Sequence, residues 1–108
     1  MARRIVLRPE VPDDLRDIVA YLEGASTSAA DRFVESVFAA LDDLAAMPGL
    51  GSPKRFRVAG ITGVRSWWVP AFKKYLIFYQ VTDEAIIVLA VVHGARNIRK
   101  LLRNRRRT

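Results

Sequence analysis

Cysteine is absent from this 108-residue sequence, and histidine occurs only once, as His93. The first absence excludes disulfides and thiolate metal sites, so packing and hydrogen bonds alone must hold the fold, and a reducing cytoplasm suits such a chain. The sequence also has no metal-ligand spacing, no phosphate-binding glycine loop and no nucleophilic triad. We therefore expect no metal, no cofactor and no catalytic residue.

Long hydrophobic runs are missing as well. The opening residues, MARRIVLRPE, are basic but carry no apolar stretch long enough for a signal peptide. No segment approaches the roughly 20 apolar residues of a membrane span. Because 51% of the residues are hydrophobic, there is material for a core. We expect one soluble, cytoplasmic domain over residues 1–108, without a membrane partner, that ends in a basic tail at about 104–108.

Positive charge is concentrated in the later part of the chain. Residues 1–43 carry five Lys or Arg and nine Asp or Glu, a balance of −4, whereas residues 44–108 carry thirteen and two, a balance of +11. Such a field speeds encounters with polyanions and acidic surfaces, but it does not distinguish nucleic acid from an acidic protein. The alternative is a basic surface that only keeps the protein in solution.

Apolar periodicity predicts a strand and two helices in the first half. Residues 3–8 alternate as in a short strand, which Pro9 ends. Residues 12–23 have helical periodicity, and Ser28 can cap a second helix that Pro48 ends. The apolar stripes are Val11, Leu15, Ile18, Val19 and Leu22 on the first helix, and Ala30, Phe33, Val34, Val37, Phe38, Leu41, Leu44 and Ala45 on the second. The helices should form an antiparallel hairpin that needs a sheet to cover it.

The second half predicts that sheet. Residues 51–53 have loop composition, 55–59 form a possible short strand and 60–63 a turn. Strands follow at 64–69, 75–81 and 85–92, the last two joined by the hairpin 82–84. The run AIIVLAVV is apolar on both faces, which favours a central strand. A short helix at 97–103 completes an α+β fold, in which an N-terminal strand and a helical hairpin accompany a mainly antiparallel twisted sheet.

Several linked segments resemble the RelE/ParE toxin superfamily over essentially the whole chain. They are DLRDIVAYL, AADRF, LAAMPGLGSP, GVRSWWVP, YLIFYQV and VVHGARN, in this order. The resemblance implies the fold shared by these toxins of type II toxin-antitoxin systems. It also implies one of two activities, since RelE-like members cut mRNA on the ribosome and ParE-like members poison DNA gyrase.

Three features favour the ParE-like branch. RelE-type nucleases carry an arginine after the tyrosine that opens the YxLxYQV strand, lysines on the preceding strand and a tyrosine on the last element. Here Leu76 follows the tyrosine, residues 66–69 read SWWV, and Leu101 and Leu102 stand in the place of the last tyrosine. Arg96 alone remains, and RNA cleavage needs a base, a charge stabiliser and an acid. The sequence therefore favours binding over catalysis.

The candidate residues for binding a target or an antitoxin combine guanidinium forks with aromatic rings. In ParE-like relatives the arginines of GVR and HGAR lie near the concave face of the sheet, and C-terminal residues contribute to toxicity. The resemblance and residue chemistry select Arg65, Trp67, Tyr79, His93, Arg96, Arg99 and Arg103.

Each candidate has a structural alternative. The two arginines Arg65 and Arg96 could form ion pairs with residues 83–84 or with the first helix. Trp67 and Trp68 should point to opposite faces of their strand, so that one covers the sheet edge. His93 suits a hydrogen-bonding role where the central strand ends. Lys73 and Lys74 should lie in a solvated turn. The carboxylate pairs 13–14 and 42–43 are typical of solvated helix faces.

The functional expectation is a ParE-like toxin that inhibits DNA gyrase by binding and forms a hetero-oligomer with a cognate ParD-like antitoxin. A RelE-like, ribosome-dependent mRNA endonuclease is the first alternative. A toxin-fold module that binds only an antitoxin is the second. Direct binding of nucleic acid is possible on charge alone but is not favoured.

Overall fold

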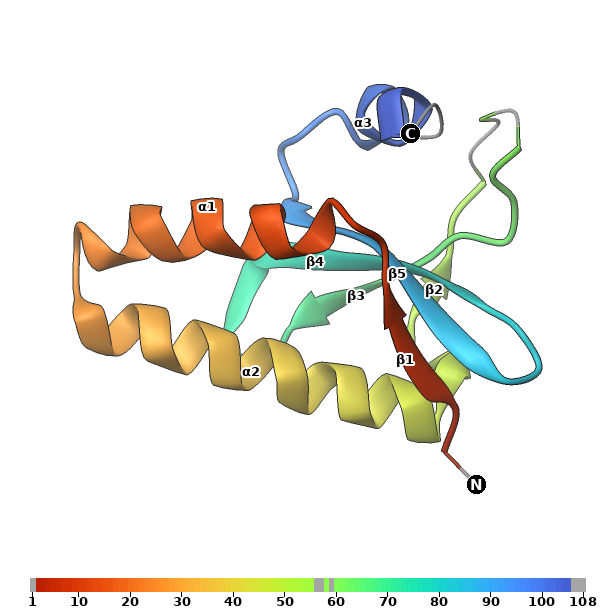
Figure 1. The fold of residues 1–108 in the computed structure, drawn as a ribbon, viewed down its shortest axis with the longest axis horizontal. Helices are drawn as coiled ribbons and strands as arrows, with labels where there is room; N and C mark the ends of the chain where they lie inside the picture. Colours follow the sequence, from red (N-terminus) through yellow and green to blue (C-terminus); the bar gives the residue numbers. More distant parts are fainter. Residues whose placement is uncertain (1, 56–57, 59, 106–108) are drawn as a thin grey trace.

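The computed structural model describes residues 2–55, 58 and 60–105. In that part of the chain, five strands form one sheet in the order β1-β5-β4-β3-β2 (Figure 1). β1 pairs with β5 in parallel and the other neighbours are antiparallel. The elements are β1 (Arg4–Leu7), α1 (Val11–Glu23), α2 (Thr27–Ala46), the 3-10 turn η1 (Pro48–Leu50), β2 (Ser52–Pro53), β3 (Arg65–Val69), β4 (Phe72–Val81), β5 (Ala85–His93) and α3 (Ile98–Arg105). The predicted fold class is confirmed.

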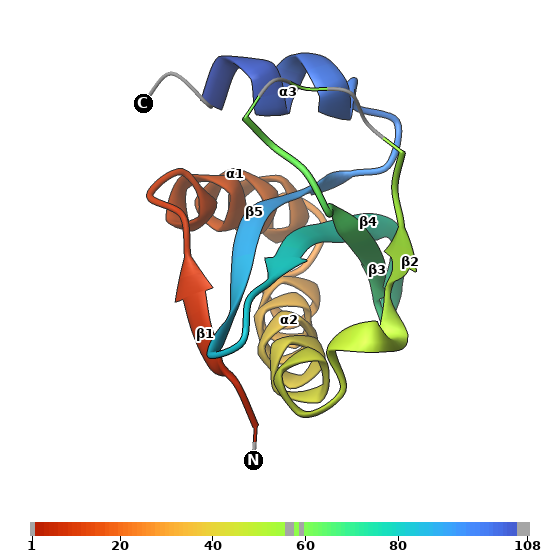
Figure 2. The ribbon, with the colours of Figure 1, turned by 90° about the vertical axis from the view of Figure 1, so that its right-hand side faces the viewer.

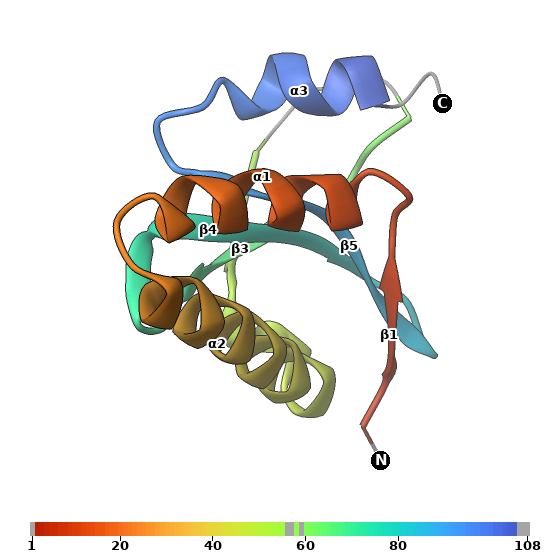
Figure 3. The same ribbon diagram turned by 60° about the vertical axis from the view of Figure 1, so that its left-hand side comes forward.

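The helical hairpin follows the sequence pattern with two corrections. α2 begins at Thr27, because the hydroxyl of Ser26 accepts a hydrogen bond from the N–H of Ala29 at 3.2 Å. The predicted cap at Ser28 is wrong, since that residue already lies within the first turn. Phe38, expected in the apolar stripe, is 47% exposed, whereas Phe33 is fully buried. α1 and α2 run side by side and antiparallel (Figure 3).

The sheet is covered on both of its faces. The main core lies between the helical hairpin and one face, where Phe33, Leu41 and Leu44 meet Ile77 and Tyr79. A second core lies on the opposite face, where α3 brings Leu102 against side chains of β4 and β5. α3 and residues 60–64, which precede β3, both lie over this second face (Figure 2). The last helix therefore covers the second core and forms part of a third layer.

β4 is longer than the sequence predicted. It begins at Phe72, so Lys73 and Lys74 lie in the strand and the prediction of a turn there is wrong. The carbonyl of Lys74 accepts a hydrogen bond from the N–H of Gly94 at 2.8 Å, which extends the ladder past the end of β5. The predicted alternation holds: Tyr75, Ile77 and Tyr79 pack in the main core, and Leu76 and Phe78 pack in the second.

β5 is the predicted central strand, but its alternation breaks in the middle. Tyr79 pairs with Val88 and Phe78 with Ala90, so Leu89 is the extra residue of a β-bulge. Leu89 and Ala90 consequently both contribute to the second core, while Val88 and Val91 contribute to the main core. The bulge shifts by one the face on which every later residue of β5 lies.

The connection between η1 and β3 differs from the prediction. Ser52–Pro53, expected as a loop, is the short strand β2, which pairs with Ser66 and Arg65. Of the possible strand at 55–59, residues 56, 57 and 59 lie outside the described residues. The predicted turn at 60–63 is present, with positive φ at Gly60 and Gly63, the region that favours glycine. In the described ranges, none of the helices has the length and apolar character needed to cross a membrane.

Candidate binding surface

Arg65 is anchored to the backbone of the chain itself. It lies on β3 opposite Tyr79, half-buried, beside the turn that follows α2. Its Nε donates to the carbonyl of Gly51 at 3.0 Å and its Nη2 to that of Gly49 at 3.3 Å. These bonds close the junction between η1 and β3. The predicted ion pair of Arg65 with residues 83–84 or the first helix is wrong, because its partners are backbone carbonyls of the turn after α2.

The two tryptophans lie together. Trp67 pairs with Ile77 and packs against the main core, and Trp68 pairs with Leu76 and is 44% exposed. Their rings nevertheless stack, with centroids 4.9 Å apart and planes 22° from parallel. Only Trp67 reaches the main core and Trp68 is exposed, as the alternation predicted, but the stacking of the two rings was not expected. The Nζ of Lys73 lies 5.6 Å from the centre of the Trp68 ring, within reach of a cation–π contact.

Tyr79 is a core residue with no surface for a partner. Its side chain is fully buried, its hydroxyl donates to the carbonyl of Pro48 at 2.7 Å, and it accepts from the N–H of Gly51 at 2.9 Å. A Cβ at Gly51 would overlap this hydroxyl and the carbonyl of Ser66. The selection of Tyr79 as a binding residue is therefore wrong: its strand faces the helical hairpin, and its polar tip satisfies the turn after α2.

His93 and Arg96 share a pocket beside α1. The pocket measures about 190 Å³ and is bordered by Tyr21 of α1 and Tyr75 of β4. Nδ1 of His93 accepts a hydrogen bond from the N–H of Ala95 at 3.0 Å, and the imidazole meets the Tyr75 ring edge-on at 5.4 Å. This is the strand-end role expected of His93. Both His93 and Arg96 are exposed and can also meet a partner.

Burial affects the tyrosine in this pocket. The pKa of the Tyr75 hydroxyl is raised above its ordinary value of 10.0, first by burial and then by the neighbouring Tyr21. A raised pKa keeps the phenol neutral and able to donate a hydrogen bond across the physiological range. Tyr21, exposed on 75% of its surface, stands at the mouth of the same pocket. The pocket therefore combines two phenols, an imidazole, a guanidinium and the carboxylates of Asp14 and Asp17.

Arg99 and Arg103 lie on the outward side of α3. The helix buries Leu102 and packs Ile98 and Leu101 on the second core, which leaves Arg99 and Arg103 exposed. Asn97 caps the helix, since its Oδ1 accepts from the N–H of Lys100 at 3.1 Å. These arginines are held on an ordered helix and not on a loose end.

Arg65 and Arg96 do not form one site. Arg65 faces Tyr79, and Arg96 follows His93, which faces Tyr75 at the other end of β4. The pocket that Arg96 borders does not include Arg65. Among the residues that the structure describes, no group of three or more His, Asp or Glu is arranged to hold a metal ion.

Asp14 and Arg105 form a buried ion pair that the sequence interpretation missed. Nη1 of Arg105 donates to Oδ2 of Asp14 at 2.8 Å, and Nη2 bonds the other carboxylate oxygen. The Asp14 side chain is 8% exposed and the Arg105 side chain is 16% exposed. The hydrogen bond to Asp14 raises the pKa of Arg105 above its ordinary value. Asp14 therefore does not belong to a solvated helix face.

The ion pair also corrects the predicted C-terminal tail. α3 extends to Arg105, so residues 104 and 105 are helical, and residues 106–108 lie outside the described residues.

A signal for the burial of Asp14 was present in the sequence. Asp14 follows Val11 by three residues and precedes Ile18 by four, which places it on the buried face of α1. For Arg105 no local pattern was available, since its partner is 91 residues away.

The positions at which the resemblance locates nuclease residues are apolar and packed. Leu76 lies on β4 against the second core, and Leu101 and Leu102 lie on α3 above the same core. Arg96 lies outside this cluster, on the α1 side. These leucines supply no group that can accept or donate a proton.

Comparison with known proteins places the chain in a family. Residues 5–98 match a family model described as "ParE toxin of type II toxin-antitoxin system, parDE". A solved chain of the "Chromosomal ParDE TA system from P. aeruginosa" shares the fold with a TM-score of 0.62 at 16% identity, over 85% of this chain and 96% of that chain. No curated protein sequence matches. Since the family model covers most of its length, the chain belongs to the ParE toxins of type II toxin-antitoxin systems.

Proposed function

We propose that this ParE toxin inhibits DNA gyrase by binding it, without catalysis, and is neutralised by a cognate ParD-like antitoxin in a hetero-oligomer. The observation that carries the proposal is the apolar character of the nuclease positions. Leu76, Leu101 and Leu102 fill the second core. RNA cleavage needs acid, base and charge-stabilising groups around one phosphate, and these leucines can provide none of them.

The exposed cationic and aromatic groups support binding. Arg96, His93 and Tyr21 border one pocket, and α3 presents Arg99 and Arg103 outward. Guanidinium groups of this kind bind carboxylates in a bidentate way, and exposed aromatic rings give an interface its apolar anchors. An antitoxin or a gyrase surface with carboxylates would match this chemistry.

The direct test is a supercoiling assay with purified gyrase, relaxed plasmid and the purified toxin. We expect a dose-dependent loss of supercoiling that prior addition of the cognate antitoxin prevents. Arg96→Ala should weaken inhibition about tenfold or more, since charge-assisted hydrogen bonds contribute about 1.5–3 kcal/mol. Arg32→Ala, which removes the same charge from an exposed position on α2, is the matched control and should inhibit as the unmodified chain does.

A ribosome assay gives the contrary outcome. The same protein is incubated with translating ribosomes and a defined mRNA, and the 5′ ends of the transcript are mapped. Cleavage that is lost on replacing His93 or Arg96, together with unchanged supercoiling, would overturn the proposal in favour of an endonuclease. If the protein binds the antitoxin but has no effect in either assay, it is a toxin-fold module that binds only an antitoxin.

A further inference from the structure

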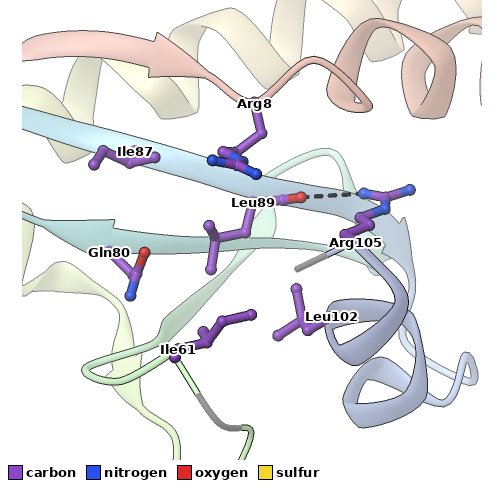
Figure 4. Close-up of a pocket in the computed structure, with 8 residues that line it drawn as sticks. Arg8, Ile61, Gln80, Ile87, Leu89, Leu102 and Arg105 are labelled. Atoms are coloured by element: carbon purple, nitrogen blue, oxygen red, sulfur yellow. Dashed lines mark hydrogen bonds between the residues drawn. The ribbon is translucent and has the colours of Figure 1, made fainter. Parts of the chain in front are cut away.

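A second pocket lies on the face of the sheet opposite the helical hairpin. It measures about 210 Å³ and is bordered by apolar side chains of three elements: Ile87 and Leu89 of β5, Ile61 of the segment before β3, and Leu102 of α3 (Figure 4). Gln80 braces one wall, because its amide nitrogen donates to the carbonyl of Thr62. The pocket is separate from the one that contains His93 and Arg96.

Two arginines border this pocket, and they differ in what they bind. Arg105 is neutralised by Asp14 and also donates to the carbonyl of Leu89 at 3.1 Å. Arg8 is half-buried, and its backbone N–H is fixed by the carbonyl of Val88 at 3.0 Å. Within the described ranges of the chain, its guanidinium has no hydrogen-bond acceptor and no carboxylate partner. Figure 4 shows this guanidinium above β5, on the side of Ile87 and Leu89.

A free guanidinium beside an apolar hollow defines the chemistry of a ligand. The hollow favours a branched apolar group, and the guanidinium favours a carboxylate that it can bind with two parallel hydrogen bonds. The volume lies below the roughly 300–1,000 Å³ of sites that enclose a whole small molecule. It suits one side chain of a larger partner better.

We propose that this pocket binds a leucine-sized side chain of an acidic peptide segment, with a neighbouring carboxylate of that segment on Arg8. The inference rests on the proposed function in one respect: the segment belongs to the antitoxin. Charge complementarity supports an acidic partner, because residues 44–108 carry a balance of +11 and α3 exposes Lys100 and Arg103 beside the pocket. The field concentrates acidic segments near the site, and the apolar hollow selects among them.

Peptide binding to the purified full chain tests the proposal. The probe is a fluorescein-labelled peptide Asp-Glu-Leu-Asp-Glu, followed by fluorescence anisotropy. We expect saturable binding that weakens about tenfold or more in Arg8→Met, which keeps an unbranched side chain but removes the charge. Arg32→Met, an equal loss of charge on α2, should bind as the unmodified chain does. A probe with serine in place of leucine should also bind about tenfold more weakly.

Equal binding by Arg8→Met and Arg32→Met, or by the two probes, would overturn the proposal, since the charge would then act without the pocket. Ile61→Trp places a larger side chain at the pocket wall, and it should weaken binding even if Arg8→Met fails to fold. Free 4-methylpentanoate offers the same chemistry without a peptide. If it displaces the probe at the affinity of the peptide itself, the site serves a small organic acid and the proposal is wrong.

Supercoiling assays separate this proposal from the proposed function. Arg8→Met should still inhibit gyrase, but the antitoxin should neutralise it less well. If the unmodified chain inhibits gyrase but does not bind the probe, the pocket proposal is wrong and the proposed function stands. If the unmodified chain binds the probe but does not inhibit gyrase, the proposed function is wrong and the pocket proposal stands.

Discussion

Asp14 and Arg105 continue the sheet where β1 ends. β1 pairs with β5 only as far as Val88, the partner of Leu7. Beyond that point Oδ2 of Asp14 accepts from the N–H of Val91 at 3.0 Å, and Nη1 of Arg105 donates to the carbonyl of Leu89 at 3.1 Å. The two side chains thus satisfy the backbone groups that a longer β1 would have bonded. In doing so they join α1, β5 and α3.

Replacing Asp14 should therefore be costly. Asp14→Ala leaves the Arg105 charge and the Val91 N–H without partners in a buried place, and we expect a loss of about 3–5 kcal/mol of unfolding free energy, measured by urea denaturation. Asp13→Ala is the control, because Asp13 pairs with Arg16 in solvent and should change stability by less than about 1 kcal/mol. Similar losses in the two variants would show that the buried pair has no special role.

The bond between Tyr79 and the turn after α2 makes a second prediction. Tyr79→Phe removes the hydroxyl that accepts from Gly51 and donates to Pro48. A buried N–H is left unsatisfied, so the unfolding free energy should fall by about 1–3 kcal/mol. Gly51→Ala should be at least as damaging, since its Cβ would overlap the Tyr79 hydroxyl. Thermal melts of the two variants check both expectations, and a fully stable Gly51→Ala would contradict this packing.

Phe33 and Phe38 lie on the same helix and should respond in opposite ways. Phe33 is fully buried and meets Phe72 and Tyr75 edge-on, with ring centroids 5.4 and 5.2 Å away, whereas Phe38 is 47% exposed. Phe33→Ala should cost about 3–5 kcal/mol, and Phe38→Ala less than about 1 kcal/mol. Chemical denaturation of both variants is sufficient, and equal losses would place Phe38 in the core after all.

Arg65 and Arg96 were selected together from the sequence, but their replacement should have different effects. Arg65→Ala removes two hydrogen bonds to backbone carbonyls and should lower the unfolding free energy by about 1–2 kcal/mol. Arg96→Ala, at an exposed position, should leave the melting temperature unchanged and weaken gyrase inhibition. A destabilised Arg96→Ala would show that Arg96, too, is structural.

Tyr75 makes the stability depend on alkaline pH. Its pKa is higher in the folded chain than the ordinary 10.0, so the unfolded chain loses this proton first. The contribution of Tyr75 to the unfolding free energy is complete below pH 10 and declines as the pH rises from there through the folded pKa. Urea denaturation at pH 9 and 11 should show a smaller decline for Tyr75→Phe than for the unmodified chain. An equal decline would assign it to other groups.

The elements with regular periodicity could be predicted, and the long-range contacts could not. Helical spacing located α1 and α2, and alternation assigned Tyr75, Ile77 and Tyr79 to one face. Burial of Tyr79 was then implied by its strand, although it was selected as a binding residue. Phe38 was misplaced because it lies at the margin of a stripe whose centre, Phe33, Val37, Ala40 and Leu44, is buried along the helix.

The candidate site was harder to predict than the fold. Arg65 has its acceptors in the turn after α2, 14 and 16 residues earlier in the chain, which no local pattern reveals. The stacking of Trp67 on Trp68 depends on the sheet edge that β3 forms there. Arg8 was interpreted only as part of a strand face, because its place beside α3 arises from the parallel pairing of β1 with β5.

The bulge at Leu89 determines the face of the sheet on which the end of β5 lies. If β5 kept its length but paired with β4 without the bulge, every residue after Leu89 would change face, and His93 would emerge on the α3 side of the sheet. The chain would then enter its last helix from the wrong side of the molecule, and Arg96 would leave the neighbourhood of Tyr21. The accommodation of one extra residue as a bulge in this strand thus determines on which side of the sheet the C-terminal segment begins.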